Sequence, residues 1–160
     1  SLAPFLVKFA ASEIHANLTN TSYLRALVRL CDALLISKER AVEHYVHQIM
    51  PALLTCMVHR KLCASPLDDH WGLRDAAARV VARACARFGA DYPSLQPRVT
   101  RTLLGAVRDR AKPLTTQYGA IAGLAALGPH VVHSILLPEV IDAAPADAPA
   151  PRGGRRVTAS

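Results

Sequence analysis

The chain has 160 residues, of which 51% are hydrophobic and 5% aromatic, and it carries a formal net charge of +7. This length fits one domain with a substantial core, and no apolar run approaches the ~18 residues that a membrane span requires. The positive charge suits an acidic protein or a nucleic acid as partner. No cluster of Lys and Arg is interleaved with aromatic residues, so stacking on bases has little support. The chain begins with Ser, and its apolar start has no basic leader, so we expect a fragment of a longer protein without a signal peptide.

Helical periodicity runs through the chain, interrupted by Pro, Gly, Asn, Ser and Asp, and no convincing alternating strand is present. The expected helices are residues 3–18, 22–37 and 42–62, one from Asp68 or Asp69 to Gly89, one from about Pro93, one between Pro113 and Gly128, and one over 130–141. In the third, Pro51 is expected to produce a kink. A short carboxylate should cap the start of the fourth, and Gly89 should end it.

Two of these helices carry clear apolar stripes. The second has Leu24, Leu27, Val28, Cys31, Leu34 and Leu35 on one face. The stripe of the fourth is Trp71, Arg74, Ala78, Val81, Cys85 and Phe88. We expect both stripes to face the core.

Two stretches rich in small residues, 71–82 and 117–128, align with an offset of 44 positions that places Arg74 on Tyr118. A period of about 40–47 residues with two helices per unit is typical of HEAT or armadillo solenoids. The expected fold is therefore all-α, a HEAT-type helical-hairpin solenoid of about three and a half repeats over residues 1–141. The small residues should let a neighbouring helix approach closely, which would offset the roughly 1 kcal/mol that Gly123 costs in mid-helix.

Residues 142–160 consist mainly of Ala, Pro, Asp, Gly and Arg, with almost nothing large and apolar. Such a segment buries too little surface to offset the entropy of ordering, so we expect a disordered tail.

The best candidate for a metal site is Cys56, His59 and Cys63, with His70 as a fourth ligand. No Cys-x-x-Cys pair is present, and buried reduced thiols explain the four cysteines better, so we expect neither metal nor cofactor. Asp68, Asp69 and His70 could act as acid–base groups, but their place at a helix start favours capping. Phosphate loops, nucleophile elbows and zinc-protease motifs are absent, and an enzyme is the least favoured class.

Several arginines are candidates for structural or partner contacts. Arg74 lies on an apolar stripe, so we expect a buried stem and an ion pair with Asp68 or Asp69. Asp75 and Arg79 have the spacing of a helix-stabilising pair. The basic rows Arg79, Arg83, Arg87 and Arg98, Arg101, Arg108 fit a solvated outer face or, alternatively, a surface for an acidic protein or nucleic acid.

Five segments together resemble one known family. They are residues 45–51, 54–56, 69–78, 113–124 and 136–138, with the His-Trp-x-Leu-Arg-Asp and Tyr-Gly-x-Ile-x-Gly-Leu motifs as the most specific parts. Residues 2–140 resemble the C-terminal HEAT-repeat domain of TFIID subunit six. The motif residues are His70, Trp71, Leu73, Arg74, Asp75, Tyr118, Gly119 and Gly123. After Ile141 the family continues into further helices, whereas this chain has its Pro-rich and Arg-rich tail.

The resemblance implies a nuclear, non-enzymatic scaffold for transcription initiation by RNA polymerase II. Its partners would be other TFIID subunits, including subunit nine through a histone fold that this chain lacks, and SAGA subunits. DNA would be contacted at most indirectly, and no membrane would be involved. A HEAT-repeat adaptor of another complex, such as a transport adaptor, and a basic solenoid that binds nucleic acid are the alternative interpretations.

Overall fold

The computed structural model describes residues 2–37 and 44–143, and within these ranges every regular element is a helix. The elements are α1 (Ala3–Ala16), α2 (Thr21–Ile36), α3 (Val46–Val58), α4 (His70–Phe88), α5 (Leu95–Arg108), α6 (Leu114–Ala126), α7 (Pro129–Val131), the π-helical turn η2 (Val132–Leu136) and α8 (Leu137–Asp142). None of these helices is both long and apolar enough to cross a membrane. Of the tail expected to be disordered, residues 144–160 lie outside the described ranges.

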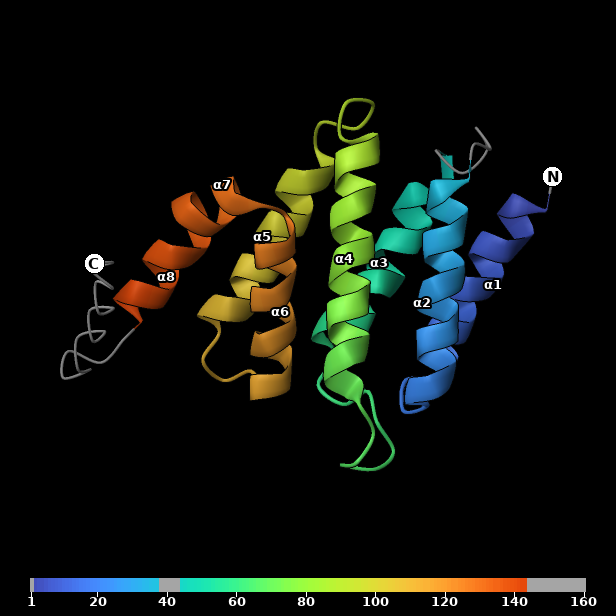
Figure 1. Cartoon of the computed structure of the whole chain (residues 1–160), viewed down its shortest axis with the longest axis horizontal. Coiled ribbons are helices and arrows are strands. Elements are labelled where there is room, and N and C mark those ends of the chain that lie inside the picture. Colours follow the sequence, from blue (N-terminus) through green and yellow to red (C-terminus); the bar gives the residue numbers. More distant parts are fainter. Residues whose placement is uncertain (1, 38–43, 144–160) are drawn as a thin grey trace, which may run out of the picture.

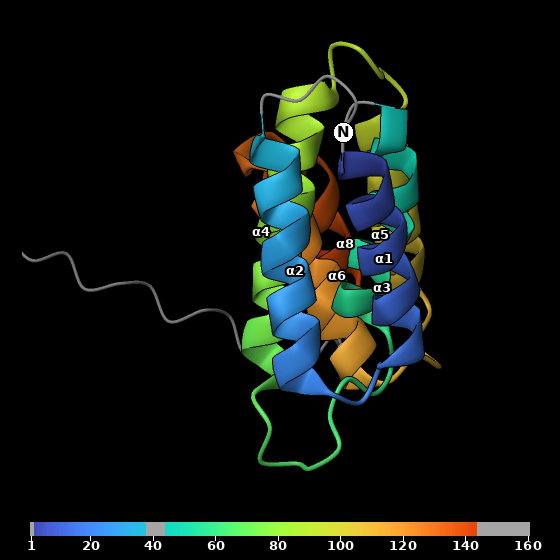
Figure 2. The same cartoon turned by 90° about the vertical axis from the view of Figure 1, so that its right-hand side faces the viewer.

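The helices form two layers. Helices α2, α4 and α6 lie side by side in one layer, and α1, α3 and α5 lie behind them (Figure 1). The edge-on view in Figure 2 separates α2 and α4 on one side from α1, α3 and α5 on the other. Successive helices run in opposite directions, so α1–α2, α3–α4 and α5–α6 are three stacked hairpins, closed at the C-terminal end by α7, η2 and α8. The prediction of an all-α HEAT-type solenoid is confirmed.

The core lies between the layers, and the predicted stripe of α2 is buried in full. The stripe of α4 is buried from Arg74 to Phe88, but Trp71 at its start is 42% exposed. The prediction for Trp71 was therefore wrong, because its ring packs edge-on against Tyr118 at the surface of α6.

The helix ends follow the sequence in part. Asp69 caps α4 by accepting the backbone N–H of Gly72 at 2.9 Å, as predicted. Helix α4 ends at Phe88 with Gly89 as its C-cap, as predicted, although Gly89 has a negative φ of −64°. A positive φ occurs at Gly128, with φ of 118°, where the chain turns from α6 into α7.

Helix α3 is continuous through Pro51 but ends at Val58, four residues earlier than predicted. The residue that follows, His59, is extended with ψ of 137°. The early end has a physical cause, because side chains from other helices bind the backbone carbonyls at this point.

Candidate functional site

Six consecutive backbone carbonyls, those of residues 57–62, each contact a side-chain hydrogen-bonding group. We call this segment, at the C-terminal end of α3, the α3 exit. Arg74 donates through Nη1 to the carbonyl of Met57 at 2.6 Å and through Nη2 to that of His59 at 2.8 Å. The last carbonyls of a helix have no donor within it, so the fork of one guanidinium supplies two of the missing partners.

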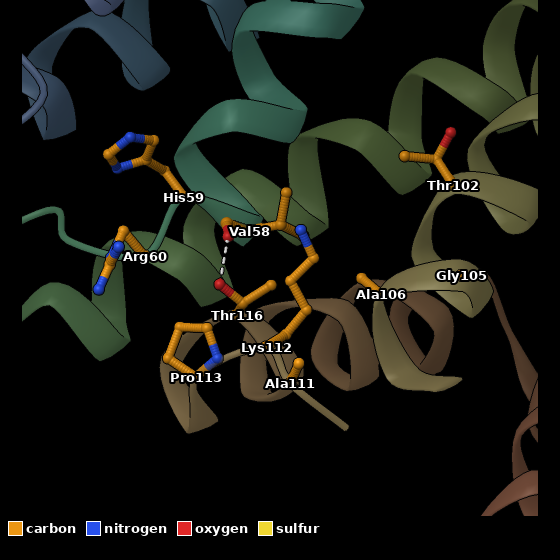
Figure 3. Close-up of a pocket in the computed structure, with 10 residues that line it drawn as sticks. All are labelled: Val58, His59, Arg60, Thr102, Gly105, Ala106, Ala111, Lys112, Pro113 and Thr116. Atoms are coloured by element: carbon orange, nitrogen blue, oxygen red, sulfur yellow. Dashed lines mark hydrogen bonds between the residues drawn. The ribbon is translucent and has the colours of Figure 1, made fainter. Parts of the chain in front are cut away.

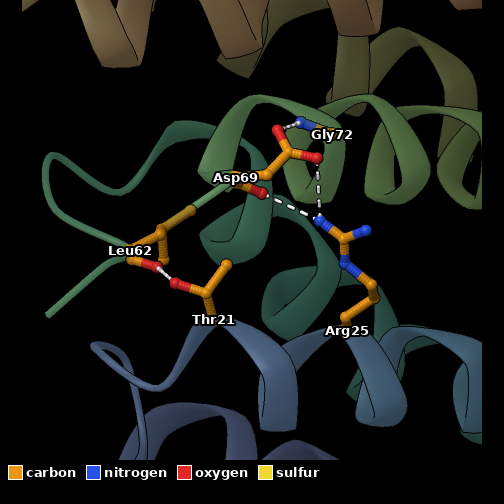
Figure 4. A network of polar contacts seen from close by, with 5 residues as sticks. All are labelled: Thr21, Arg25, Leu62, Asp69 and Gly72. Carbon is orange, nitrogen blue, oxygen red and sulfur yellow. Dashed lines mark hydrogen bonds and ion pairs between the residues drawn. The ribbon is translucent and has the colours of Figure 1, made fainter. Parts of the chain in front are cut away.

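Threonines from two other helices pair with further carbonyls of the α3 exit. Thr116 on α6 donates to Val58 at 2.6 Å (Figure 3), and Thr115 donates to Arg60 at 2.8 Å. Thr21 at the start of α2 donates to Leu62 at 2.7 Å (Figure 4).

The remaining carbonyl of the α3 exit, that of Lys61, lies 2.9 Å from Nδ1 of His59. Helices α2, α4 and α6, one from each hairpin, are thus held against the same short segment of backbone. Sequence reasoning missed all three threonines, because their partners lie 41 to 58 residues away and leave no local signal.

The predicted ion pair between Arg74 and Asp68 or Asp69 was wrong. Asp69 pairs with Arg25 on α2 at 3.1 Å, as Figure 4 shows. Asp68 accepts the backbone N–H groups of Ala64 and Ser65. Arg74 is fully buried with backbone carbonyls as its partners. Its charge lies at the negative end of the α3 dipole, which favours a cation there.

Burial shifts the pKa values of Arg74 and of its buried neighbour His70. It lowers the pKa of Arg74 to about 10, so the guanidinium is still charged at neutral pH. Burial, and then the charge of Arg74, lower the pKa of His70. His70 is accordingly a neutral imidazole, whose Nδ1 accepts from Nε of Arg74 at 3.3 Å.

Two glycines let α6 approach the α3 exit. A Cβ at Gly119 would overlap the carbonyl oxygen of Met57, and one at Gly123 would overlap the side chains of Met57 and Leu103. The prediction that small residues permit close helix packing is confirmed, and the helices approached are α3 and α5.

Other motif residues meet at the surface. The rings of Trp71 and Tyr118 lie 4.9 Å apart at 74°, and the ring of His70 lies 4.2 Å from that of Trp71. The hydroxyl of Tyr118 donates to Asp75 at 2.8 Å, which raises the pKa of Tyr118. Asp75 therefore does not form the predicted pair with Arg79, since its carboxylate is turned toward α6.

This contact belongs to a larger exposed apolar surface, which we call the α4–α6 aromatic surface. It consists of Trp71, Leu114, Tyr118 and Ile121. Leu114 is 79% exposed, and Tyr118 and Ile121 are each 38% exposed. The three α6 residues are spaced by four and three, which places them on one helix face. Clustered exposed aromatic and aliphatic side chains are typical of protein-binding sites.

The six arginines of the basic rows divide into two groups. Arg83 pairs with Asp32 on α2 at 3.3 Å, Arg87 donates to the carbonyls of Leu35 and Ser37, and Arg108 pairs with Glu139 on α8. Arg79, Arg98 and Arg101 are exposed and form no ion pair with the described residues. Because α4 and α5 belong to different layers, the two rows do not run side by side.

The candidate metal ligands are not gathered together. Cys56 is buried, Cys63 is half-buried and the Nδ1 atom of His59 is engaged with its own loop. Burial raises the pKa of Cys56 and Cys31 to about 12, as expected for thiols that pack as small apolar groups. Across residues 2–37 and 44–143, no group of three or more His, Cys, Asp or Glu residues is placed to hold a metal ion.

Stacked antiparallel hairpins with an exposed aromatic surface define a HEAT-repeat protein of the kind that presents helices to partners. Residues 1–141 match the family described as the TAF6 C-terminal HEAT repeat domain, and the chain belongs to this family.

Known relatives agree with this assignment. The chain is 43% identical over 139 residues to "Transcription initiation factor TFIID subunit 6b" of Arabidopsis thaliana, covering 87% of this chain and 26% of the relative. It is 40% identical to "SAGA complex/transcription factor TFIID complex subunit Taf6" of Schizosaccharomyces pombe, covering 87% of this chain and 31% of the relative. The chain thus spans about a quarter to a third of the length of these relatives.

A solved structure shares the fold. The "TAF6 C-terminal domain from Antonospora locustae" superposes with a TM-score of 0.79 at 27% identity, covering 88% of this chain and 69% of the other.

Proposed function

We propose that this chain is a scaffold domain of TFIID, without enzymatic activity, that supports transcription initiation by RNA polymerase II through contacts with other subunits in the nucleus. The match of residues 1–141 to the TAF6 C-terminal HEAT repeat domain carries the proposal. The name of the S. pombe relative includes both SAGA and TFIID, so membership in a SAGA-type complex is part of the proposal. In the whole protein, subunit nine would pair with a histone fold outside this chain.

The α4–α6 aromatic surface is the part of the domain best suited to bind another subunit. Trp and Tyr are enriched among the residues that contribute most to protein–protein binding. The rings of Trp71 and Tyr118 are held against each other, and the Tyr118 hydroxyl is bound to Asp75. Little side-chain entropy therefore remains to be lost when a partner binds.

Exposed arginines on α4, and on α5 in the other layer, would add contacts with acidic groups of a partner. Arg79, Arg98 and Arg101 have no ion-pair partner in the described part of the chain and are free to meet acidic groups. Arg83, Arg87 and Arg108 are committed to contacts within the domain, so their loss would act first on packing between repeats. We do not propose DNA as a direct ligand, because the free arginines are spread over both layers.

Affinity purification from nuclear extract tests this function. The tagged chain should recover TFIID or SAGA subunits, and the double substitution Trp71→Ala with Tyr118→Ala should reduce that recovery. Phe5→Ala is the matched control, since Phe5 is an exposed aromatic residue on α1 at the other end of the solenoid. Recovery of transport cargo or cytoplasmic proteins, with no TFIID or SAGA subunit, would refute the proposal.

A further inference from the structure

A cavity of about 590 Å³ opens where the α3 exit meets α5 and the connection from α5 to α6 (Figure 3). It lies on the side of the α3 exit where Thr116 binds Val58, and it is separate from the α4–α6 aromatic surface. Val58, Ala106 and Pro113 give it an apolar lining.

The ionisable residues that line this cavity are His59, Arg60 and Lys112, and no carboxylate lines it. Figure 3 shows the Lys112 side chain rising from the α5–α6 connection toward Val58. Neither Arg60 nor Lys112 forms an ion pair with the described residues. Asp109, the nearest acidic residue in the connection, uses its carboxylate to accept the N–H of Ala111. The cavity is therefore basic and lacks an internal counter-ion.

The other polar groups around the cavity are already paired. The hydroxyl of Thr116 donates to the backbone carbonyl of Val58, and that of Thr102 donates to the backbone carbonyl of Arg98 on its own helix. The carbonyls of the α3 exit, which would repel an anion if left free, each have a side-chain partner. The donors left for a ligand are thus cationic, and a ligand with carboxylates would complement them.

One glycine on α5, Gly105, is exposed and packs closely against no other helix. Gly105 lies in the cavity wall, and a Cβ built on it would meet nothing within 4 Å. Gly119 and Gly123 are different, because a side chain at either would overlap another helix. A glycine in mid-helix costs roughly 1 kcal/mol relative to Ala, and at Gly105 no helix contact compensates for that cost.

We propose that this cavity binds an acidic, partly apolar segment of a partner protein, with a carboxylate held by Lys112 and an aliphatic side chain against Val58, Ala106 and Pro113. The proposal rests on the proposed function in that the occupant is a protein. It adds a second docking site and states the chemistry of what binds there.

Nuclear magnetic resonance with the ¹⁵N-labelled chain tests this. The probe is a short acetylated peptide in which Glu and Leu alternate, at about 150 mM salt so that nonspecific attraction between exposed charges is screened. We expect shifts at the amides of Gly105, Lys112 and Thr116. The same peptide with Gln in place of Glu should produce none of these shifts.

Three variants locate the binding. Lys112→Glu removes a cation, and Gly105→Leu fills the cavity at a position with open space; each should weaken binding about tenfold, a change of about 1.4 kcal/mol. Lys8→Glu makes the same substitution at an exposed lysine on α1 that forms no ion pair with the described residues, and it should bind the peptide within about twofold of the unmodified chain. Thermal unfolding of each variant shows that the fold is intact.

The opposite results are equally clear. Equal binding of the Gln peptide, unchanged binding by Gly105→Leu, or equal weakening by Lys8→Glu and Lys112→Glu would each overturn the proposal. So would a short DNA duplex that displaces the peptide and depends on the same residues, since nucleic acid would then be the occupant. If the Gly105→Leu chain binds no peptide but still recovers TFIID subunits, both proposals are upheld. If the unmodified chain binds the peptide but recovers no subunit, only the proposed function is contradicted.

Discussion

The guanidinium of Arg74 on α4 donates a 2.6 Å hydrogen bond to the carbonyl of Met57 on α3, and no carboxylate takes part. The contact joins two helices of one hairpin through the backbone of the first. A cation at this point satisfies carbonyls that the helix itself leaves unpaired. The guanidinium thus acts as a shared cap at the centre of the solenoid.

We predict that Arg74→Ala lowers the free energy of unfolding by about 3 kcal/mol or more, since it leaves two buried carbonyls without donors and opens a cavity. Arg74→Lys should lose about 2 kcal/mol, because one ammonium cannot span the carbonyls of Met57 and His59. Urea denaturation measures both effects. Arg79→Ala on the exposed face is the control and should stay within about 0.5 kcal/mol. Equal stability of the Lys variant would show that the two-pronged geometry is unimportant.

A threonine that contacts the α3 exit can be compared with one that does not. Thr116→Val removes the donor to Val58 from a position that is only 4% exposed, and it should destabilise the fold by about 1–3 kcal/mol. Thr102→Val loses a hydroxyl that bonds within its own exposed helix turn, so its effect should stay below about 0.5 kcal/mol. Denaturant midpoints compare the two. An equal loss in both variants would contradict the role of the α3 exit.

Glycine-to-alanine substitutions should have opposite signs at two positions. Gly119→Ala should destabilise by about 2–3 kcal/mol, because its methyl group would overlap the Met57 carbonyl and push α6 away from α3. Gly105→Ala should stabilise by up to about 1 kcal/mol, since the methyl group meets open space and Ala favours helix. Differential scanning calorimetry gives both changes. A stabilising Gly119→Ala would mean that α6 does not pack this closely.

Stability should fall in mildly acidic solution because of His70. Its folded pKa lies below the ordinary value of 6.5, so the unfolded chain binds this proton more readily. The contribution is present above pH 6.5 and is lost as the pH falls through the lowered folded value. His70→Gln, which cannot titrate and can still accept from Arg74, should flatten this part of the profile. Urea midpoints of the two proteins between about pH 7.5 and 5 measure the difference; parallel profiles would contradict it.

The buried faces and the cap at Asp69 could be predicted from the sequence, because each depends on residues within a few turns of one another. The repeat could be predicted because residues 71–82 and 117–128 match directly at an offset of 44 positions. The partners of Arg74 could not, because helical periodicity shows that a side chain is buried but not what lies across from it. Asp68 and Asp69 are nearer in sequence than Met57, yet capping and Arg25 already occupy them. The exposure of Trp71 could not be predicted either, because it depends on where α6 lies.

The early end of α3 has a similar origin. Residues 59–62 fit a helical pattern, yet their carbonyls accept hydrogen bonds from Thr21, Thr115 and Arg74 elsewhere in the chain, and these bonds stabilise a non-helical backbone there. The sequence singles out the motif residues, and their role in a site stays a prediction. Their division between a buried junction and an exposed surface required the structure.

In a solenoid whose repeats touch only their neighbours, hairpins can come apart one after another from either end. Here the carbonyl of Val58 in the middle hairpin depends on Thr116 in the next, and that of Leu62 depends on Thr21 in the one before. Detaching either terminal hairpin therefore uncovers polar backbone at the centre. The three hairpins are coupled in this way, so the domain should unfold in one concerted transition rather than fray repeat by repeat.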